Sequence, residues 1–288
     1  MSTTTSPPPA AELAEQHGLA PSSARPTFGV YVAQLWQRRH FIAAFATSRT
    51  VSHYSSSMLG QLWQVLTPLM NAAVYFLIFG ILFQTAKSVD NFVAFLVTGV
   101  FVFTFTQRSV TSGARAISGN LALIRALHFP RAALPVAFTI VELRQLLISM
   151  AVLCVIVLAT GEPLTLAWLL VIPALMLQTM FNLGVSLFIA RIGSSLPDIS
   201  QLLPFITRTW LYMSGVFFVI SDRIHDEPLR TIMQVNPGAI FIELVRDALI
   251  DTHTAPQLAW LVAVGWAVLA LCGGFWFFWA AEERYGRG

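Results

Sequence analysis

The side chains best suited to metal binding or acid–base chemistry are concentrated between residues 221 and 257. Glu243, Asp247 and Asp251 recur every four residues and would share one face of a helix. Carboxylates and histidines in this arrangement can bind a divalent cation. The alternative is a solvated polar face interleaved with Arg246, and we expect no metal site here. The remaining candidates of this kind are Asp222, His225, Asp226, Glu227 and His253.

The signature motifs of nucleotide hydrolysis and of covalent catalysis do not occur. The sequence contains no GxxxxGK[ST] phosphate-binding loop and no GxSxG, HExxH or CxxC pattern. We therefore expect this chain to carry no cofactor, so that any ATP and Mg²⁺ would be bound by another subunit.

Four charged residues lie within or beside long apolar segments: Arg108, Glu142, Arg144 and Arg208. A charge at the centre of a bilayer costs about 2.5–3.5 kcal/mol on insertion scales, so such residues face a protein interior, a partner or water. Glu142 is predicted to pair with Arg208 or Arg108. Two roles stay open for these charges, a buried strut between helices and the entrance of a transport pathway.

Two groups of aromatic side chains recur at helical spacing. They are Tyr75, Phe79 and Phe83, and Trp210, Phe217 and Phe218. Aromatic rings offer apolar faces, and Tyr and Trp add a polar tip, which together suit the binding of sugars. Both groups are candidates for the wall of a substrate path, and ordinary packing between helices is the alternative.

Composition indicates that membrane helices position these residues. Of the 288 residues, 56% are hydrophobic and only 11% are charged, and the mean hydropathy is +0.69. Soluble domains are about 45–50% apolar and about 25% charged. A net charge of +3 is also too balanced for a nucleic-acid-binding protein. We exclude a typical soluble enzyme and predict an all-α membrane protein.

Six apolar segments are long enough to cross a hydrocarbon core of about 30 Å, which takes about 20 helical residues. They are Trp63–Gln84, Phe92–Ser112, Leu134–Thr160, Leu164–Ala190, Ile199–Ile220 and Leu258–Ala280. Residues 1–27 are rich in proline and are predicted to form a disordered cytoplasmic tail. Residues 28–57 have an apolar face beside arginines and are predicted to form an interfacial amphipathic helix. Residues 58–288 would form the transmembrane domain.

The distribution of arginines predicts the orientation of the chain. Most of the 17 basic residues fall in segments that are cytoplasmic if the N-terminus is inside, and cytoplasmic loops are enriched in such residues. Six spans then place both termini in the cytoplasm. The external segment contains AIFIELVRDALI, residues 239–250, which is too short and too charged to cross. We predict a re-entrant or surface helix there.

Four motifs follow one another along the chain. The first, within residues 52–80, places Tyr54, Ser57, Gly60, Trp63 and Pro68 at the entry to the first span, and the second is NLALIRALHFPRAALP, residues 120–135. The third is PDISQLLPF, which contains Asp198, and the fourth is Asn236-Pro237 followed by Arg246.

In this order the motifs resemble the ABC-2 permeases of polysaccharide, O-antigen and teichoic-acid export, the Wzm type. The resemblance covers roughly residues 30–285. His53 and Ser55 stand where basic residues are common in that family, and Pro197 replaces the usual arginine before Asp198. Contacts with phosphate or a lipid headgroup are therefore not expected at these three positions.

The resemblance implies the architecture of a type V exporter: a homodimer of this chain with two ABC ATPase subunits, in the inner (cytoplasmic) membrane. It implies export of a lipid-linked polysaccharide such as an O-antigen-like glycan. Because Lys87 is the only lysine among the 17 basic residues, we favour the actinobacterial branch of the family, and a galactan is then the preferred cargo. The balanced charge predicts no nucleic-acid partner. The resemblance also assigns docking on the ATPase to one segment. The docking residues would be Leu121, Ile124, Arg125, His128, Phe129, Pro130 and Arg131.

Two other functions are compatible with the sequence. One is an ABC-2 exporter of a drug or a small lipid. The other is a membrane-embedded glycosyl- or acyltransferase, for which the acidic and histidine residues of segment 221–257 are the only support.

Overall fold

The computed structural model describes residues 26–54, 59–82, 89–127 and 129–285. Within these ranges every regular element is helical, which confirms the predicted all-α fold. The predicted tail lies outside the described residues except for Pro26 and Thr27.

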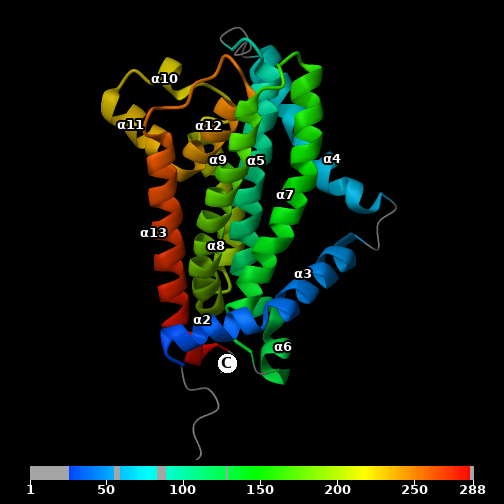
Figure 1. Cartoon of the computed structure of the whole chain (residues 1–288), viewed down its shortest axis with the longest axis vertical. Coiled ribbons are helices and arrows are strands. Elements are labelled where there is room, and N and C mark those ends of the chain that lie inside the picture. Colours follow the sequence, from blue (N-terminus) through cyan, green and yellow to red (C-terminus); the bar gives the residue numbers. More distant parts are fainter. Residues whose placement is uncertain (1–25, 55–58, 83–88, 128, 286–288) are drawn as a thin grey trace, which may run out of the picture.

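The body of the molecule is a bundle of long helices that run along its longest axis (Figure 1). In the described part of the chain, five helices are long and apolar enough to cross a membrane. They are α4 (Trp63–Tyr75), which continues as a π-helix over Phe76–Leu82, α5 (Phe92–Ala114), α7 (Ala133–Ala159), α8 (Val171–Ser195, preceded by a 3₁₀ turn at Leu166–Leu170) and α13 (Ala259–Trp279). Their bounds agree closely with five of the six predicted spans.

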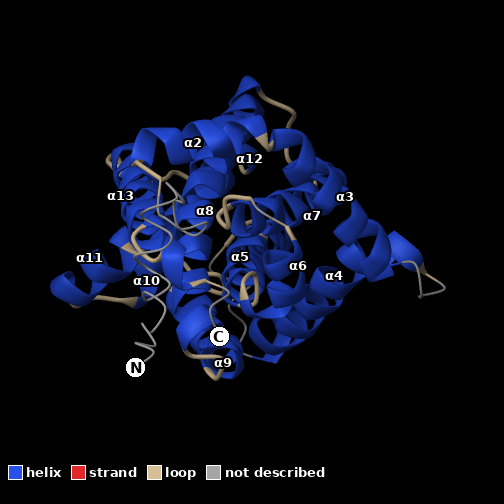
Figure 2. Ribbon diagram, turned by 90° about the horizontal axis from the view of Figure 1, so that it is seen from below, coloured by secondary structure: helices blue, strands red, loops and turns tan. Residues whose placement is uncertain are grey.

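Helix α5 occupies the centre of the bundle (Figure 2) and is buried over most of its length. Phe95, Phe101 and Phe103 are fully buried along it. Beside it, α8 and α13 approach each other closely through glycine. A Cβ atom on Gly184 would collide with the backbone of Ala270, so only glycine permits this approach.

The fifth predicted span differs from the expectation. Helix α9 (Ile199–Met213) has 15 residues, or about 22 Å at 1.5 Å per residue, which is short of the hydrocarbon thickness. The chain bends at Ser214, and Gly215 adopts a left-handed φ of 63° that ends the helix. Six crossings of the membrane therefore stay a prediction, while five candidate helices are present.

Three shorter helices cap the upper end of the bundle in Figure 1: α10 (Ile220–Arg223), α11 (Glu227–Val235) and α12 (Pro237–Leu249). Helix α12 is buried and packs against α5, α8 and α13, whereas α11 is largely exposed. The segment 239–250 is thus a helix covered by protein, as a re-entrant position at membrane depth would require.

The lower end of the bundle is crossed by α2 (Phe28–Gln37) and α3 (Arg39–Tyr54), beside α6 (Leu121–Ala126) (Figures 1 and 2). Phe28, Val32 and Trp36 of α2 are exposed. An exposed apolar face on a helix lying across the ends of membrane spans fits the interfacial location predicted for residues 28–57, which stays a prediction.

A buried polar cluster, here called the Tyr31–Glu282–Arg131 node, joins three segments at this lower end. The Tyr31 hydroxyl donates to Glu282 Oε2 at 2.7 Å and accepts from the Ala132 amide at 3.1 Å. Glu282 Oε1 accepts from the Arg131 amide at 2.9 Å, and the Arg131 guanidinium lies 3.6 Å from the same oxygen. Burial raises the pKa of the Glu282 carboxyl and of the Tyr31 phenol. The node fastens α2 to the C-terminal segment and to the start of α7.

Candidate functional site

A cavity of about 970 Å³ opens where α3, α4, α5, α7 and α9 meet. These helices are far apart in the sequence, so no single motif defines the cavity. Its lining is mixed, with arginines, hydroxyls and amides beside two aromatic rings. The lining residues are Arg49, Trp63, Thr67, Arg108, Thr111, Ser112, Arg115, Gly119, Asn120, Phe138, Val141, Glu142, Gln145, Ser200 and Pro204.

Two arginines of the cavity form hydrogen bonds with uncharged amide side chains. Arg108 Nη1 donates to Gln145 Oε1 at 2.7 Å, and Arg49 Nη2 donates to Asn120 Oδ1. The Arg49 guanidinium also lies 5.2 Å from the ring centre of Phe45 and 5.5 Å from that of Phe138. Among the described residues, no carboxylate forms an ion pair within 4.0 Å with Arg49, Arg108 or Arg115. Their positive charge is therefore not neutralised by a direct contact.

Among the described residues that line this cavity, Glu142 is the only acidic side chain. It lies close to Arg108 and Ser112, and its buried Oε2 has no hydrogen-bond partner in the described structure. The ion pair predicted for Glu142 with Arg208 or Arg108 does not form within 4.0 Å to either arginine in the described structure, although Arg108 is the nearby charge. The Arg208 side chain is exposed.

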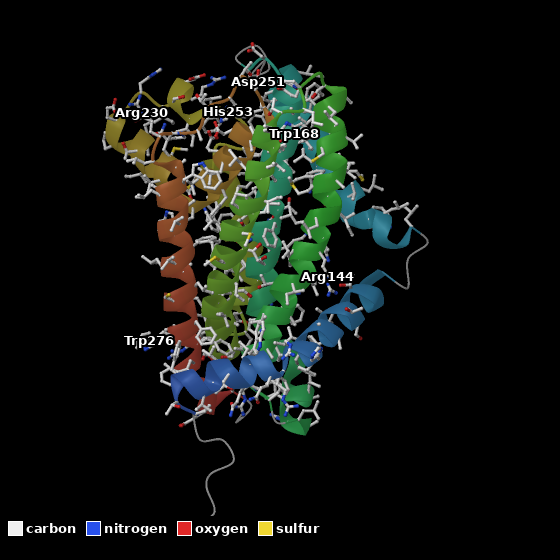
Figure 3. The ribbon with its side chains drawn as sticks, in the orientation of Figure 1. Arg144, Trp168, Arg230, Asp251, His253 and Trp276 are labelled. Carbon is white, nitrogen blue, oxygen red and sulfur yellow. The ribbon has the colours of Figure 1, made fainter. Side chains whose placement is uncertain are left out.

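Arg144, two residues after Glu142, belongs to a different contact. Its Nη1 donates to Thr47 Oγ1 of α3 at 2.9 Å, and Figure 3 shows it on the side of α7 that faces α3. Arg144 therefore connects α7 to α3 by one hydrogen bond and is not among the residues that line the cavity.

The first aromatic group lies farther along the helix that begins as α4 and packs around the ring of Phe217. Phe217 is fully buried, and its ring centre lies 4.4 Å from Phe79 and 4.7 Å from Tyr75. Tyr212 joins at 5.4 Å. We call Tyr75, Phe79, Tyr212 and Phe217 the aromatic cluster. Phe83 lies outside the described residues.

Trp210 and Phe218 lie apart from this cluster. The Trp210 indole donates to Asn236 Oδ1 at 2.7 Å and packs edge-on against Phe103 of α5, so it faces the interior of the bundle. Phe218 is half-buried and packs near Ile220. The shared helix face predicted for Trp210, Phe217 and Phe218 does not form, because α9 ends at Met213.

The segment predicted to dock on an ATPase lies at the lower end of the bundle (Figure 1). Leu121 and Arg125 are exposed, as is the neighbouring Leu127. Ile124 and Pro130 are buried, and the half-buried Phe129 ring lies 5.0 Å from Phe41 of α3. Arg131 belongs to the Tyr31–Glu282–Arg131 node, and His128 lies outside the described residues.

Comparison with known proteins identifies the family. The sequence model of the family described as "ABC-2 type transporter" matches residues 42–250. The chain belongs to the ABC-2 type transporter family. This places it among transport components and not among membrane-embedded transferases, and it fits a multi-pass membrane protein with several apolar helices.

Two curated relatives are permeases by name. The chain is similar to the O-antigen export system permease protein RfbA of Myxococcus xanthus, with 25% identity over 88% of this chain and 94% of the relative. It is also similar to the protein of the same name from Klebsiella pneumoniae, with 29% identity over 67% of this chain and 74% of the relative. Both agree with the Wzm-type resemblance of the sequence motifs.

The motif Asn236-Pro237 with Arg246 fastens α12 of this ABC-2 transporter to the bend after α9. Asn236 Oδ1 accepts from the Gly238 amide at 3.1 Å, which caps α12, and from Trp210. Arg246 is fully buried and donates to the carbonyls of Gly215 and Val216, both at 2.9 Å. Pro237 occupies the first position of α12, where its missing amide proton costs nothing.

The acidic residues Glu243 and Asp247 of the external segment each contact a different set of partners. Glu243 pairs with Arg246 at 3.0 Å and with His253 at 2.7 Å, and Asp247 accepts from the Ala255 amide at 2.9 Å. Asp251 lies beyond the end of α12, so the predicted face of three carboxylates is incomplete. Within the described ranges, no group of three metal-ligating side chains gathers.

The other motif positions surround the entry to α4. Gly60 adopts a φ of 50° at the start of a 3₁₀ turn, and Trp63 begins α4 and lines the cavity. Pro68 is buried within α4, and Asp198 is exposed just before α9. Tyr54 ends α3 and Ser57 lies outside the described residues.

Sequence reasoning missed two arginines of the cavity. Arg49 and Arg115 are among the basic residues that the sequence places in cytoplasmic segments, and nothing in their local sequence indicates a shared cavity.

Proposed function

We propose that this chain is the permease subunit of an ATP-driven exporter that moves a lipid-linked polysaccharide across the inner membrane, with both termini in the cytoplasm. The O-antigen permeases to which the chain is similar support this cargo class. The sequence has no phosphate-binding loop of its own, so a separate ABC ATPase, in two copies per transporter, would supply the energy.

One observation carries the proposal: α4 connects a charged cavity to an aromatic cluster. Trp63 and Thr67 of this helix line the cavity, and Tyr75 and Phe79 of its upper part pack on Phe217. A cargo with an ionic headgroup and a chain of sugars needs both environments, one after the other along its path. Polar lining accommodates the charge, and aromatic rings offer faces on which sugars can stack.

We propose that the path lies between two copies of the chain, with α4 and α9 of one copy facing those of the other. Both helices carry exposed apolar side chains, among them Met70 and Val74 on α4 and Leu202 and Phe205 on α9. The bundle of one chain leaves this side of α4 uncovered, as Figure 1 shows. A second copy would cover it and would place two aromatic clusters along one path, with Trp210 and Phe218 packed behind them.

The path is tested by replacing an aromatic residue of the cluster. Tyr75→Ala is expected to lower export of the glycolipid about two- to tenfold, since a favourable aromatic contact contributes about 0.5–1.5 kcal/mol. Trp276→Ala is the matched control, because Trp276 is 62% exposed at the lower end of α13 and points away from the bundle (Figure 3). Unchanged export by Tyr75→Ala, at normal expression and assembly, would remove this residue from the path.

Docking of the ATPase on segment 121–131 has a separate test. Leu127 is 49% exposed beside α6 and suits an apolar contact with a partner. Leu127→Asp is expected to abolish copurification with the ATPase, whereas Leu164→Asp at the opposite end of the bundle should leave it intact. Retained copurification of Leu127→Asp would place the docking site elsewhere.

A galactan is our preferred cargo. The assay is ATP hydrolysis by the purified transporter with lipid-linked galactan, with another lipid-linked glycan or with a hydrophobic drug. Stimulation by galactan alone supports the proposal. Stimulation by the drug, without a response to either glycolipid, would instead favour a drug or small-lipid exporter.

A further inference from the structure

Helix α11, at the upper end of the bundle, is strongly amphipathic. Leu229, Ile232 and Met233 are spaced by three and four residues, so they share one face of the helix. Arg230 and Gln234, which are four residues apart, lie on the other side. A helix with apolar and polar side chains on separate faces needs an apolar surface on one side and water on the other.

Protein covers one edge of the apolar face of α11. Met233 is buried and packs with Ile220 of α10 and Ala239 of α12. In the described part of the chain, Leu229 is 44% exposed and Ile232 is 66% exposed. Figures 1 and 2 show α11 at the outer edge of the bundle near α13, and Figure 2 shows α4 on the opposite side. The exposed apolar side chains therefore lie far from the helix that we propose to face a second copy.

A hydrogen bond fixes the depth of α11 relative to α13. The Trp266 indole donates to the carbonyl of Val235, the last residue of α11, at 2.8 Å. Trp266 follows Ala259, where α13 begins, by about 10 Å along the axis at 1.5 Å per residue. The end of α11 thus lies beside a candidate span and not above it. A carbonyl at such a depth in lipid needs a donor from the protein, because water does not supply one, and the indole is that donor.

The exposed side of α13 begins next to this contact. Leu269 lies one turn along α13 from Trp266 and is 65% exposed, and Leu258, two turns away in the other direction, is 66% exposed. Lipid tails are as apolar as leucine side chains, so a membrane span can present such residues to them. The apolar faces of α11 and α13 therefore meet the same surroundings.

We propose that α11 is an interfacial anchor whose apolar face inserts into the lipid bilayer at the upper end of the bundle, which is the outer leaflet in the proposed orientation. Leu229 and Ile232 contact acyl chains. Glu227 and Arg230, which form an ion pair with each other, face headgroups and water. Amphipathic helices of this kind lie about 5–10 Å into the boundary between headgroups and acyl chains. The inference does not depend on the identity of the cargo.

The test is spin labelling of the full-length chain in nanodiscs of phosphatidylethanolamine and phosphatidylglycerol. Cys154 and Cys272 are replaced by alanine, and a single nitroxide is attached at Ile232→Cys. The matched control is Thr231→Cys, since Thr231 is the exposed polar neighbour, and Leu261→Cys on α13, where Leu261 is 71% exposed, is the lipid reference. Oxygen concentrates in lipid, whereas a nickel chelate stays in water. We expect oxygen to dominate the collisions at positions 232 and 261, and the nickel chelate to dominate at position 231.

Trp266→Phe separates insertion into lipid from attachment to the bundle. It keeps an aromatic ring and removes the donor to the Val235 carbonyl. In lipid the unpaired carbonyl is drawn toward water, so the label at position 232 is expected to lose collisions with oxygen and gain collisions with the nickel chelate. In water, solvent would replace the indole and the label would not change. An unchanged label would therefore overturn the depth assigned to α11.

Two further results would overturn the proposal. Equal access of the nickel chelate to positions 232 and 231 would place both faces of α11 in water. Protection of position 232 from both reagents, with dipolar broadening between labels, would show that a second copy of the chain covers the apolar face. Neither result would bear on ATP-driven export, which is measured separately.

Discussion

Replacing Arg246 should be among the most damaging single changes in the chain. Its guanidinium is fully buried and makes five hydrogen bonds. Two go to the Phe95 carbonyl at 3.2 and 3.1 Å, one each to the carbonyls of Gly215 and Val216, and one to Glu243. A single side chain thus joins α5, the bend after α9 and α12.

The magnitude follows from what the replacement leaves behind. Removing one partner of a buried ion pair costs about 3–5 kcal/mol, since the other charge stays buried without compensation. In Arg246→Met, Glu243 keeps only His253, and three backbone carbonyls lose their donor. We expect a loss of about 3–5 kcal/mol in the free energy of unfolding.

The assay is reversible unfolding in mixed micelles, with thermal unfolding as a second measure. Glu243→Gln in the Arg246→Met background should recover part of the loss, because it removes the uncompensated carboxylate. Arg230→Met is the control, as Arg230 is partly exposed and pairs only with the exposed Glu227. A loss below about 1 kcal/mol for Arg246→Met would refute the reasoning.

Further expectations concern close packing and pH. Gly184→Ala should destabilise the protein by about 1–3 kcal/mol, because its methyl group would collide with the Ala270 backbone, whereas Gly273→Ala, with no atom within 4 Å, should change stability by less than about 0.5 kcal/mol. Equal melting temperatures of the two variants would contradict the close approach of α8 and α13. The raised pKa of Glu282 means that the folded state holds this proton more tightly than the unfolded state, so the contribution of Glu282 to stability declines as the pH rises from the unfolded-state pKa through the raised pKa. Thermal unfolding between pH 5 and pH 8 should show this decline in the wild type and a flatter profile in Glu282→Gln; identical profiles would exclude Glu282 as the titrating group.

The long helices could be predicted from the sequence because their length and apolar content leave few alternatives. Hydropathy placed α5 at Phe92–Ser112 against an observed Phe92–Ala114. The same reasoning extended α9 to Ile220, because hydropathy does not register the backbone bend. The C-terminal end of α9 is set by the left-handed conformation of Gly215 and by the buried Arg246, which donates to the Gly215 carbonyl. This contact joins positions that are 31 residues apart in the sequence.

The candidate site was harder to predict from the sequence than the long helices. The sequence singles out Arg108 as a charge within an apolar segment, but Arg49 and Arg115 join it at the cavity only when five helices assemble. Phe217 was assigned to the face of Trp210, and the bend separates the two. Trp210 instead explains part of the asparagine-proline motif, since it binds the same Asn236 oxygen that caps α12.

Reconstitution into proteoliposomes tests the central claim most directly. The chain would be inserted with its ABC ATPase, and a lipid-linked glycan would be followed across the bilayer with and without ATP. We predict ATP-dependent movement that requires both subunits and stops when the ATPase is inactivated by mutation. Movement of the glycolipid by this chain alone, or at the same rate without ATP, would contradict the account.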